Sequence, residues 1–162
     1  MDTRPVGVFD SGIGGLTVVK EIMKIIPNED IVYFGDTARV PYGSKSKETI
    51  IKFARQDARF LIEKGVKAIV IACNTASAFS LETLKNELSI PIIGVIEPGA
   101  HSAVKSTVNG NIGIIGTEGT IGSGAYEKAI LKLRSDYRIS GYPCPLFVPL
   151  VEEGWAGSKV SY

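Results

Sequence analysis

The sequence predicts an α/β fold with two similar lobes, each built from a mostly parallel sheet flanked by helices. The first observation is that short runs rich in Val and Ile alternate with longer segments whose apolar residues recur every three or four positions. This alternation is typical of parallel strands joined by helices. The second is that a later segment repeats the start of the chain in outline: an apolar strand, then glycines and hydroxyls, then a helix. We therefore expect a first lobe over residues 1–97 and the incomplete start of a second lobe over residues 98–162.

Four runs in the first lobe are expected to form strands, because each is short, apolar and bounded by turn residues. These runs are Val6–Phe9, Ile31–Phe34, Val66–Ala72 and Pro91–Ile96. The third run is the richest in Ile and Val and lacks alternation with polar residues. Such a run indicates a strand that is buried on both of its faces.

Helices are expected between these strands. The first would run from Leu16 to Ile26, where Pro27 stops it. The second has the clearest helical periodicity and should end at Gly65, which stands where a C-cap is expected. Its apolar face consists of Ile50, Phe53, Ala54, Ala58 and Leu61. The third helix would turn Leu81, Leu84 and Leu88 inward.

The second lobe is expected to begin at a hinge formed by Glu97-Pro98-Gly99, followed by a short helix over Ala100–Lys105. The strand Ile112–Ile115 then opens into a turn rich in Gly and Thr. Regular patterning weakens in the segment Pro143–Pro149, and the sequence stops at Tyr162 on what resembles the start of a helix. We interpret the chain as a fragment, or as one whose second lobe is incomplete.

The composition is that of a globular domain, with 44% hydrophobic and 22% charged residues among 162. The formal net charge is +1 and no basic block is present, which argues against a nucleic-acid partner. The longest apolar stretches are too short to cross a membrane, and the N-terminus lacks the apolar core of a signal peptide. Two cysteines do not make a disulfide framework in a chain of this length. We expect a cytoplasmic protein without a membrane partner.

Cys73 is the first candidate for chemistry. It ends the third apolar run and is followed directly by Asn74, Thr75, Ala76 and Ser77. Asn, Ser and Thr are residue types that can cap the start of a helix. The thiol would then lie at the carboxyl end of a buried strand and face the positive end of a helix, where a thiol pKa is lowered. The alternative is an inert buried cysteine that behaves as a small hydrophobe.

The glycine-rich turn Asp10–Gly15 is the second candidate. Its backbone N–H groups could hold a carboxylate or phosphate at the start of a helix, and Asp10 could orient or ionise a neighbouring group. The spacing of its glycines is neither a dinucleotide fingerprint nor a P-loop. The alternative is a tight turn that needs glycine for steric reasons alone.

Other residues have plainer interpretations. Tyr42-Gly43, after Pro41, can be a simple turn, and Glu152 would ordinarily face solvent. Cys144 lies between two prolines and is interpreted as structural. His101 is the only histidine, so no histidine-based metal cluster can form, and we expect no metal ion. A cysteine hydrolase would have to use His101 as its base from outside the cluster of strand ends.

Three motifs together resemble the glutamate racemase family. They are Asp10–Thr17, Pro41-Tyr42-Gly43 and Cys73–Ser77, and the segment Pro145–Glu152 fits the same family. The resemblance runs from the first strand to the last residue. A Cys-Asn-Thr sequence alone would also suit aspartate racemases, and the other two motifs are what favour glutamate.

The resemblance implies a cofactor-independent enzyme that interconverts L- and D-glutamate, supplying D-glutamate for peptidoglycan, with the substrate between two α/β lobes. In such enzymes two cysteines act as acid and base on opposite faces of the α-carbon. Cys73 would be the first of them, with Asp10 and Ser11 contacting substrate and supporting the thiol. Full-length members of the family can also pair as homodimers.

The resemblance further assigns substrate contacts. Tyr42-Gly43 would bind the substrate carboxylate region, and Asn74-Thr75 the α-amino and α-carboxylate groups. Thr117 and Glu152 would lie on the second lobe's side of the cleft.

One departure from the family is evident. The second catalytic cysteine belongs to a Cys-Thr-His motif that these 162 residues lack, and Cys144 belongs to a segment that precedes it. We therefore expect the chain to be inactive, or nearly so, alone. The alternatives are a non-catalytic glutamate-binding or regulatory module, an aspartate-type racemase, and a thiol hydrolase or amidase.

Overall fold

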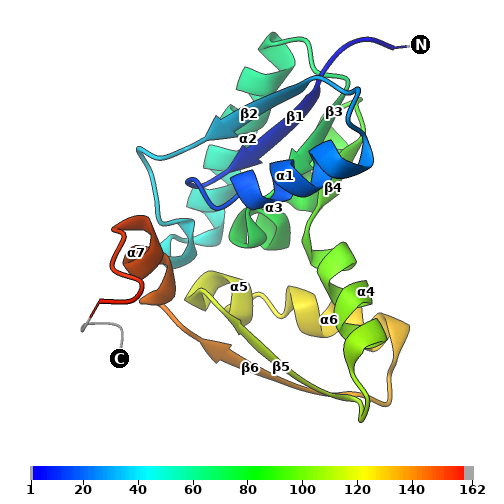
Figure 1. Cartoon of the computed structure of the whole chain (residues 1–162), viewed down its shortest axis with the longest axis vertical. Helices are drawn as coiled ribbons and strands as arrows, with labels where there is room; N and C mark the ends of the chain where they lie inside the picture. The colour runs from blue at the N-terminus through cyan, green and yellow to red at the C-terminus, as the bar shows by residue number, and fades with distance from the viewer. Residues whose placement is uncertain (1, 159–162) are drawn as a thin grey trace.

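The computed structural model describes residues 2–158, which form two parallel sheets surrounded by helices (Figure 1). The larger sheet contains β1 (Val6–Asp10), β2 (Ile31–Gly35), β3 (Ala68–Ile71) and β4 (Ile92–Gly94), and the smaller contains β5 (Asn111–Gly116) and β6 (Arg138–Pro143). The predicted α/β class, with parallel sheets flanked by helices and a smaller second part, is confirmed.

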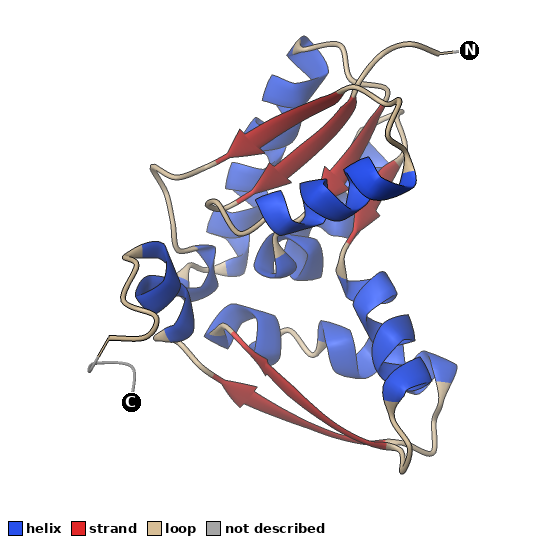
Figure 2. Ribbon diagram, in the orientation of Figure 1, coloured by secondary structure: helices blue, strands red, loops and turns tan. Residues whose placement is uncertain are grey.

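The larger sheet has the strand order β2-β1-β3-β4, and all neighbouring strands run parallel. α1 (Leu16–Ile25) covers one face, while α2 (Lys47–Glu63) and α3 (Asn74–Glu87) cover the other (Figure 2). The chain thus leaves β1 and β3 toward opposite faces of the sheet. In such sheets a crevice opens at the carboxyl ends of the two strands, and it is there that ligands bind.

The core follows from the alternation of side chains along these strands. β1 is buried along its whole length because it lies inside the sheet. Phe9 packs among residues of α2 and α3, whereas Val6 and Val8 pack against α1. In β3, Ile71 is fully buried on the α2–α3 side, but Val70 on the α1 side is only partly buried. The predicted burial of this strand is therefore confirmed for one face only, because α1 alone covers the other.

α2 has the apolar face that its periodicity predicts, with Phe53 at the partly exposed margin. Ser46 begins the helix by accepting a hydrogen bond from the Thr49 N–H at 3.3 Å. Gly65 follows its end with φ of +75°, a left-handed conformation that glycine adopts without steric cost. Asp57 also lies on the apolar face and is fully buried, which the periodicity did not indicate.

The smaller sheet is built from one predicted and one unpredicted strand. β5 extends the predicted strand by one residue at each end, and it is followed by α5 (Glu118–Gly122) and α6 (Ala125–Leu133). β6 was missed because its sequence contains Ser, Gly and Pro and only one aliphatic residue. Most of β6 is exposed, so burial placed little constraint on its composition. No helix within residues 2–158 has the length and apolarity required to cross a membrane.

Two sequence predictions for the second part were wrong. The expected hinge at Glu97-Pro98-Gly99 is the first turn of α4 (Ile96–Ser106), where proline is tolerated because the first N–H groups of a helix lack intrahelical acceptors. Regular structure was not expected in the Pro-rich segment, but a helix, α7 (Phe147–Glu152), begins within it. The helix start expected at the end of the sequence stays a prediction. Residues 159–162 lie outside the described residues.

The left-handed C-cap generates a stability prediction. We expect Gly65→Ala to lower the free energy of unfolding by about 1–2 kcal/mol, because an alanine Cβ is disfavoured at positive φ. Urea denaturation would measure the change. Gly122→Ala is the matched control: its backbone is not left-handed and no atom lies within 4 Å of the added Cβ. An equal loss in both variants would contradict this account of Gly65.

Candidate functional site

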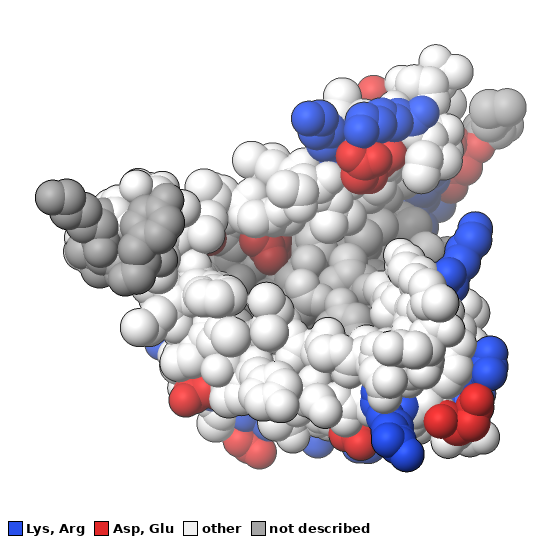
Figure 3. Space-filling view, turned by 60° about the horizontal axis from the view of Figure 1, so that its bottom comes forward, with Lys and Arg blue, Asp and Glu red and all other residues white. Residues whose placement is uncertain are grey.

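A cavity of about 700 Å³ lies between the two sheets. The face turned forward in Figure 3 is hollowed here, with an acidic side chain inside the hollow and basic side chains outside it. On one side the lining contains Asp10, the last residue of β1, and Cys73, which follows β3; on the other it contains Gly116 and Cys144, which end β5 and follow β6. All nine predicted site residues line this cavity: Asp10, Ser11, Tyr42, Gly43, Cys73, Asn74, Thr75, Thr117 and Glu152.

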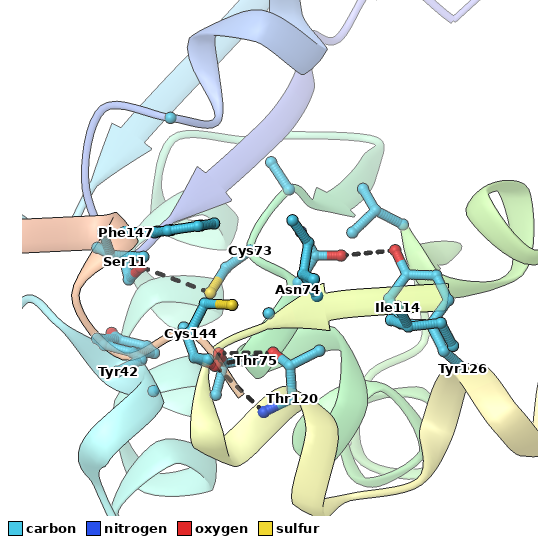
Figure 4. Close-up of a pocket in the computed structure, with 18 of the residues that line it drawn as sticks. Ser11, Tyr42, Cys73, Asn74, Thr75, Ile114, Thr120, Tyr126, Cys144 and Phe147 are labelled. Atoms are coloured by element: carbon cyan, nitrogen blue, oxygen red, sulfur yellow. Dashed lines mark hydrogen bonds between the residues drawn. The ribbon is translucent and has the colours of Figure 1, made fainter. Parts of the chain in front are cut away.

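Cys73 is itself the N-cap of α3. Its sulfur accepts a hydrogen bond from the Ala76 N–H at 3.4 Å, and its S–H donates to Ser11 Oγ at 3.5 Å (Figure 4). The polar residues that follow Cys73, from Asn74 onward, are the first helical residues and not the cap. The thiol thus lies between the turn after β1 and the start of α3, as its place in the sequence predicted. The difference is that Cys73 itself caps the helix, whereas the residues after it were expected to do so.

The expected lowering of the thiol pKa is contradicted. Burial raises the pKa of Cys73, and the nearby negative charge of Asp10 raises it further. When the thiol ionises, the Ser11 hydroxyl can reverse its hydrogen bond and donate to the sulfur, as the backbone N–H groups of Ala76 and Ser11 do. These bonds favour the thiolate and lower the pKa, but they do not outweigh burial. Cys73 is therefore protonated at neutral pH and is ready to act as an acid.

The glycine-rich turn is organised by Asp10. One carboxylate oxygen accepts hydrogen bonds from the Gly12 N–H at 3.1 Å and the Gly15 N–H at 3.0 Å. These two N–H groups are therefore already bonded to the side chain of Asp10. This corrects the expectation that all backbone N–H groups of the turn could bind a ligand anion. Asp10 is only 7% exposed, yet it borders the cavity beside Cys73. It fixes the turn and places a negative charge near the thiol.

Three threonine hydroxyls join the two parts of the chain at the cavity. Thr75, in the first turn of α3, lies 2.9 Å from Thr117 and 3.0 Å from Thr120, measured between hydroxyl oxygens. Thr117 is the N-cap of α5 and accepts from the Thr120 N–H at 3.2 Å. Sequence reasoning missed Thr120, although its spacing from Thr117 at a helix start was a usable signal.

Asn74 is oriented from the second part of the chain. The Tyr126 hydroxyl, on α6, donates to Asn74 Oδ1 at 2.7 Å (Figure 4). Because the amide oxygen is engaged, the NH₂ group of Asn74 is left to donate to other partners. No sequence pattern pointed to Tyr126, since the contact joins residues 52 positions apart.

The Tyr42-Gly43 turn forms a short 3₁₀ helix, η1 (Tyr42–Ser44), at the cavity edge. The phenol of Tyr42 is only 1% exposed, and its hydroxyl hydrogen-bonds to the carboxylates of Asp36 and Asp57. Its side chain is therefore committed to the protein interior, which leaves the backbone of the turn for any ligand. Gly43 packs so closely on Thr117 that a Cβ at this position would collide with it.

Glu152 lies across the cavity from the first sheet, near the end of α7. A Cβ on Gly12 would collide with its carboxylate, so the side chain lies over the glycine-rich turn. Burial raises the pKa of Tyr33, and the charges of Asp10, Glu152 and Cys73 raise it further. Glu152 is thus part of an acidic group at the site, and the plain interpretation of a solvent-facing charge is corrected.

Cys144 lies closer to the site than a structural role suggests, whereas His101 lies outside it, as expected. Cys144, which was interpreted as structural, lines the same cavity as Cys73 and is partly buried. His101 is exposed on α4 and is not part of the lining. A thiol hydrolase that uses His101 as its base is thereby disfavoured. Within residues 2–158, no three His, Cys, Asp or Glu side chains are grouped so as to hold a metal ion.

The fold and the site define a class: an α/β protein with a buried thiol in a cleft between two parallel sheets, with carboxylates and hydroxyls around it. Comparison with known proteins specifies the family. Residues 11–142 match the family described as Asp/Glu/Hydantoin racemase, and the chain belongs to this family.

Individual relatives agree with this assignment. A glutamate racemase of Geobacter metallireducens is 54% identical over 162 residues, covering 100% of this chain and 60% of the relative. The crystal structure of glutamate racemase isoform RacE1 from Bacillus anthracis matches with a TM-score of 0.94 and 44% identity, over 99% of this chain and 60% of that one. That of Francisella tularensis glutamate racemase in complex with D-glutamate matches with a TM-score of 0.89 and 50% identity, over 99% and 60%. The chain spans about 60% of the length of these relatives.

The thiol environment generates a prediction about reactivity. We expect Asp10→Asn to lower the pKa of Cys73 and to make alkylation by iodoacetamide several times faster at pH 8, because the thiolate is the nucleophile and a negative charge beside it is removed. The measurement is alkylation rate against pH, with Cys144→Ser as background so that Cys73 is the only thiol.

Ser11→Ala is the control of opposite sign. It removes the Ser11 hydroxyl, which can donate to the thiolate once Cys73 ionises, so we expect alkylation at pH 8 to slow. A shift in the same direction for both variants would contradict the assignment of these two causes.

Proposed function

We propose that this chain provides a glutamate-binding half-site in which Cys73 is one of the two thiols that move the α-proton in glutamate racemisation. The observation that carries the proposal is the position of Cys73: a buried thiol that caps a helix, held by Ser11 beside Asp10, and bordering a cavity between two sheets. Membership of the racemase family supports it, and so does the D-glutamate complex of the Francisella relative.

The charges of glutamate fit the lining. Glutamate carries two carboxylates and one ammonium group, and Asp10 and Glu152 are the only charged side chains among the described lining residues. They suit the ammonium group. The carboxylates would be bound by neutral donors: the hydroxyls of Thr75 and Thr117, the NH₂ group of Asn74, and the first backbone N–H groups of η1 at Tyr42-Gly43, which have no acceptor within that helix.

The chemistry requires a base on one face of the α-carbon and an acid on the other. A thiolate takes the proton, the electron pair of the broken C–H bond is delocalised into the adjacent carboxylate, and a second thiol donates a proton from the opposite face. Preorganised donors stabilise the developing charge, and each ~1.4 kcal/mol gained increases the rate about tenfold. Where Cys73 alone exchanges the proton, a proton removed from one face returns to the same face.

The raised pKa of Cys73 favours a second candidate, a non-catalytic glutamate-binding module, because a protonated thiol is not a base at neutral pH. The division of the chain at residues 97 and 98, the cytoplasmic location, the role in supplying peptidoglycan and the homodimer of full-length relatives stay predictions.

The test is exchange of the α-proton of D- and L-glutamate in deuterated water, followed by NMR, with the 162-residue chain. We expect exchange of one enantiomer without inversion, at a rate that rises with pH because the thiolate is the base. Exchange should be lost in Cys73→Ala, which should still bind glutamate in calorimetry.

Other outcomes are informative. Binding without exchange would favour the non-catalytic module. The absence of binding of either enantiomer would overturn the glutamate site, and racemisation of both enantiomers would overturn the restriction to a half-site.

The contact between Tyr126 and Asn74 gives a prediction about affinity. We expect Tyr126→Phe to weaken glutamate binding about tenfold, the contribution of roughly one hydrogen bond, because Asn74 loses the partner that fixes its amide. Calorimetry measures the affinity, and Tyr137→Phe is a control outside the cavity lining. Unchanged affinity in Tyr126→Phe would contradict the role assigned to this contact.

A further inference from the structure

A cluster of ionisable side chains lies beneath the η1 turn. Its members come from separate segments: Asp36 follows β2, Arg39 is in the next loop, Tyr42 is in η1 and Asp57 is on α2. Asp36 is 4% exposed and Asp57 is fully buried. Burying two carboxylates is costly unless they are paired and hydrogen-bonded, so their presence on this apolar face needs a physical reason.

The contacts within the cluster join at Tyr42. Its hydroxyl hydrogen-bonds to Asp36 Oδ2 and lies 2.8 Å from Asp57 Oδ2. Arg39 approaches both acids, with Nε 2.6 Å from Asp36 Oδ2 and Nη2 2.8 Å from Asp57 Oδ1. The Arg39 guanidinium also stacks 4.2 Å from the centre of the Phe53 ring. A single phenol is thereby tied to α2 and to the end of β2 at once.

The Tyr42 phenol has only one hydrogen, but two carboxylates lie within hydrogen-bonding distance of its oxygen. A phenol has one hydrogen to donate, so it satisfies both acids only if one of them is protonated and donates to the phenol oxygen. Burial raises the pKa of Asp57 to about 7, and the charge of Asp36 adds to this, while hydrogen bonds from Tyr42 and Arg39 oppose it. Below about pH 7, Asp57 is therefore the acid that carries the extra proton.

The other end of the same turn contacts the second part of the chain. Gly43 packs directly on Thr117, and the Gly43 carbonyl oxygen lies beside Gly119. Thr117 in turn contacts Thr75 in the first turn of α3. The turn therefore contacts the acid cluster through the Tyr42 side chain and contacts the threonines that line the cavity through Gly43.

We propose that Asp57, which does not line the cavity, is a positioning residue that acts through Tyr42 to hold the Tyr42–Ser44 turn at the cavity and against Thr117. The role assigned to the turn in ligand binding rests on the proposed function, but the positioning itself does not. When Asp57 is ionised, two carboxylates share one phenol hydrogen and one guanidinium, and the turn is held less tightly. When it is protonated, every group in the cluster has a partner.

The pH dependence has a definite sign. The pKa of Asp57 is higher in the folded chain than in the unfolded chain, so the folded state binds the proton more tightly. The resulting stability is fully present below the unfolded pKa of about 4 and is lost as the pH rises to about 7. The groups that face Asp57 are Asp36, Arg39 and Tyr42.

Amide hydrogen exchange of residues 42–45 in the full chain tests the proposal, with intrinsic exchange rates corrected for pH. We expect protection of these amides to fall about tenfold in Tyr42→Phe and Asp57→Ala, roughly the loss of one hydrogen bond, while amides of β1 change little. In the unaltered chain, protection of the turn should be lower at pH 8 than at pH 6. Asp57→Asn should keep the turn protected and remove this difference, because Asn can accept from Tyr42 but does not titrate.

Gln56→Ala is the matched control, since Gln56 is the other hydrogen-bond partner of Arg39 and lies outside the buried cluster. It should leave the turn unchanged. Equal loss of protection in the turn and in β1, unchanged protection in Tyr42→Phe, or a difference between pH 6 and pH 8 that persists in Asp57→Asn would overturn the proposal. If Asp57→Ala fails to fold, these two variants still decide the outcome.

Glutamate affinity by calorimetry separates the two proposals. Weaker binding in Tyr42→Phe, with an unchanged Cys73 alkylation rate, would place the effect at the turn and not at the thiol. If the unaltered chain binds no glutamate, the proposed function fails, and the exchange data still test the role of Asp57.

Discussion

The parallel pairing of β1 with β3 is the constraint on which the site depends. The two strands lie side by side, but the helices that follow them cover opposite faces of the sheet. The carboxyl ends of the two strands are therefore left uncovered between diverging connections. Asp10 ends one strand and Cys73 follows the other, so a carboxylate and a thiol 63 positions apart become neighbours. Both residues line the cavity.

Two opposing effects act on the thiol. Capping of α3 and hydrogen bonding to Ser11 would stabilise a thiolate, whereas burial and the charge of Asp10 favour the protonated form. Burial is the larger effect in this chain. A thiol held in this way is oriented without being ionised. Its ionisation would require a change in the charge or solvation of the site, such as a positive charge placed beside Asp10.

The second part of the chain supplies groups that the larger sheet cannot. Thr117 and Thr120 join Thr75 in a hydroxyl group that bridges α3 and α5, and Tyr126 orients Asn74 from α6. The η1 turn lies between the two parts and is supported by buried acids. These contacts are polar, so they fix orientation at the cavity, whereas the free energy of folding comes mainly from the apolar layers on the larger sheet.

The sequence by itself determined the α/β class, the positions of five of the six described strands (all four of the larger sheet and β5), and the candidates Asp10 and Cys73 at strand ends. It could do so because hydrophobic periodicity and turn residues are local signals, and because parallel strands bring their carboxyl ends to one edge. The family resemblance also brought Glu152 into the predicted site before its position was known.

Only the tertiary structure decided the rest. The direction of the Cys73 pKa shift depends on how deeply the thiol is buried and on its distance from Asp10. A local sequence pattern determines neither of these. The buried acid cluster under Tyr42, the contact of Tyr126 with Asn74 and the presence of Cys144 in the cavity all join residues distant in sequence. β6 escaped prediction because a strand that is mostly exposed needs no apolar run. Local patterns specify elements, but the packing of those elements sets the charges, partners and solvation that determine chemistry.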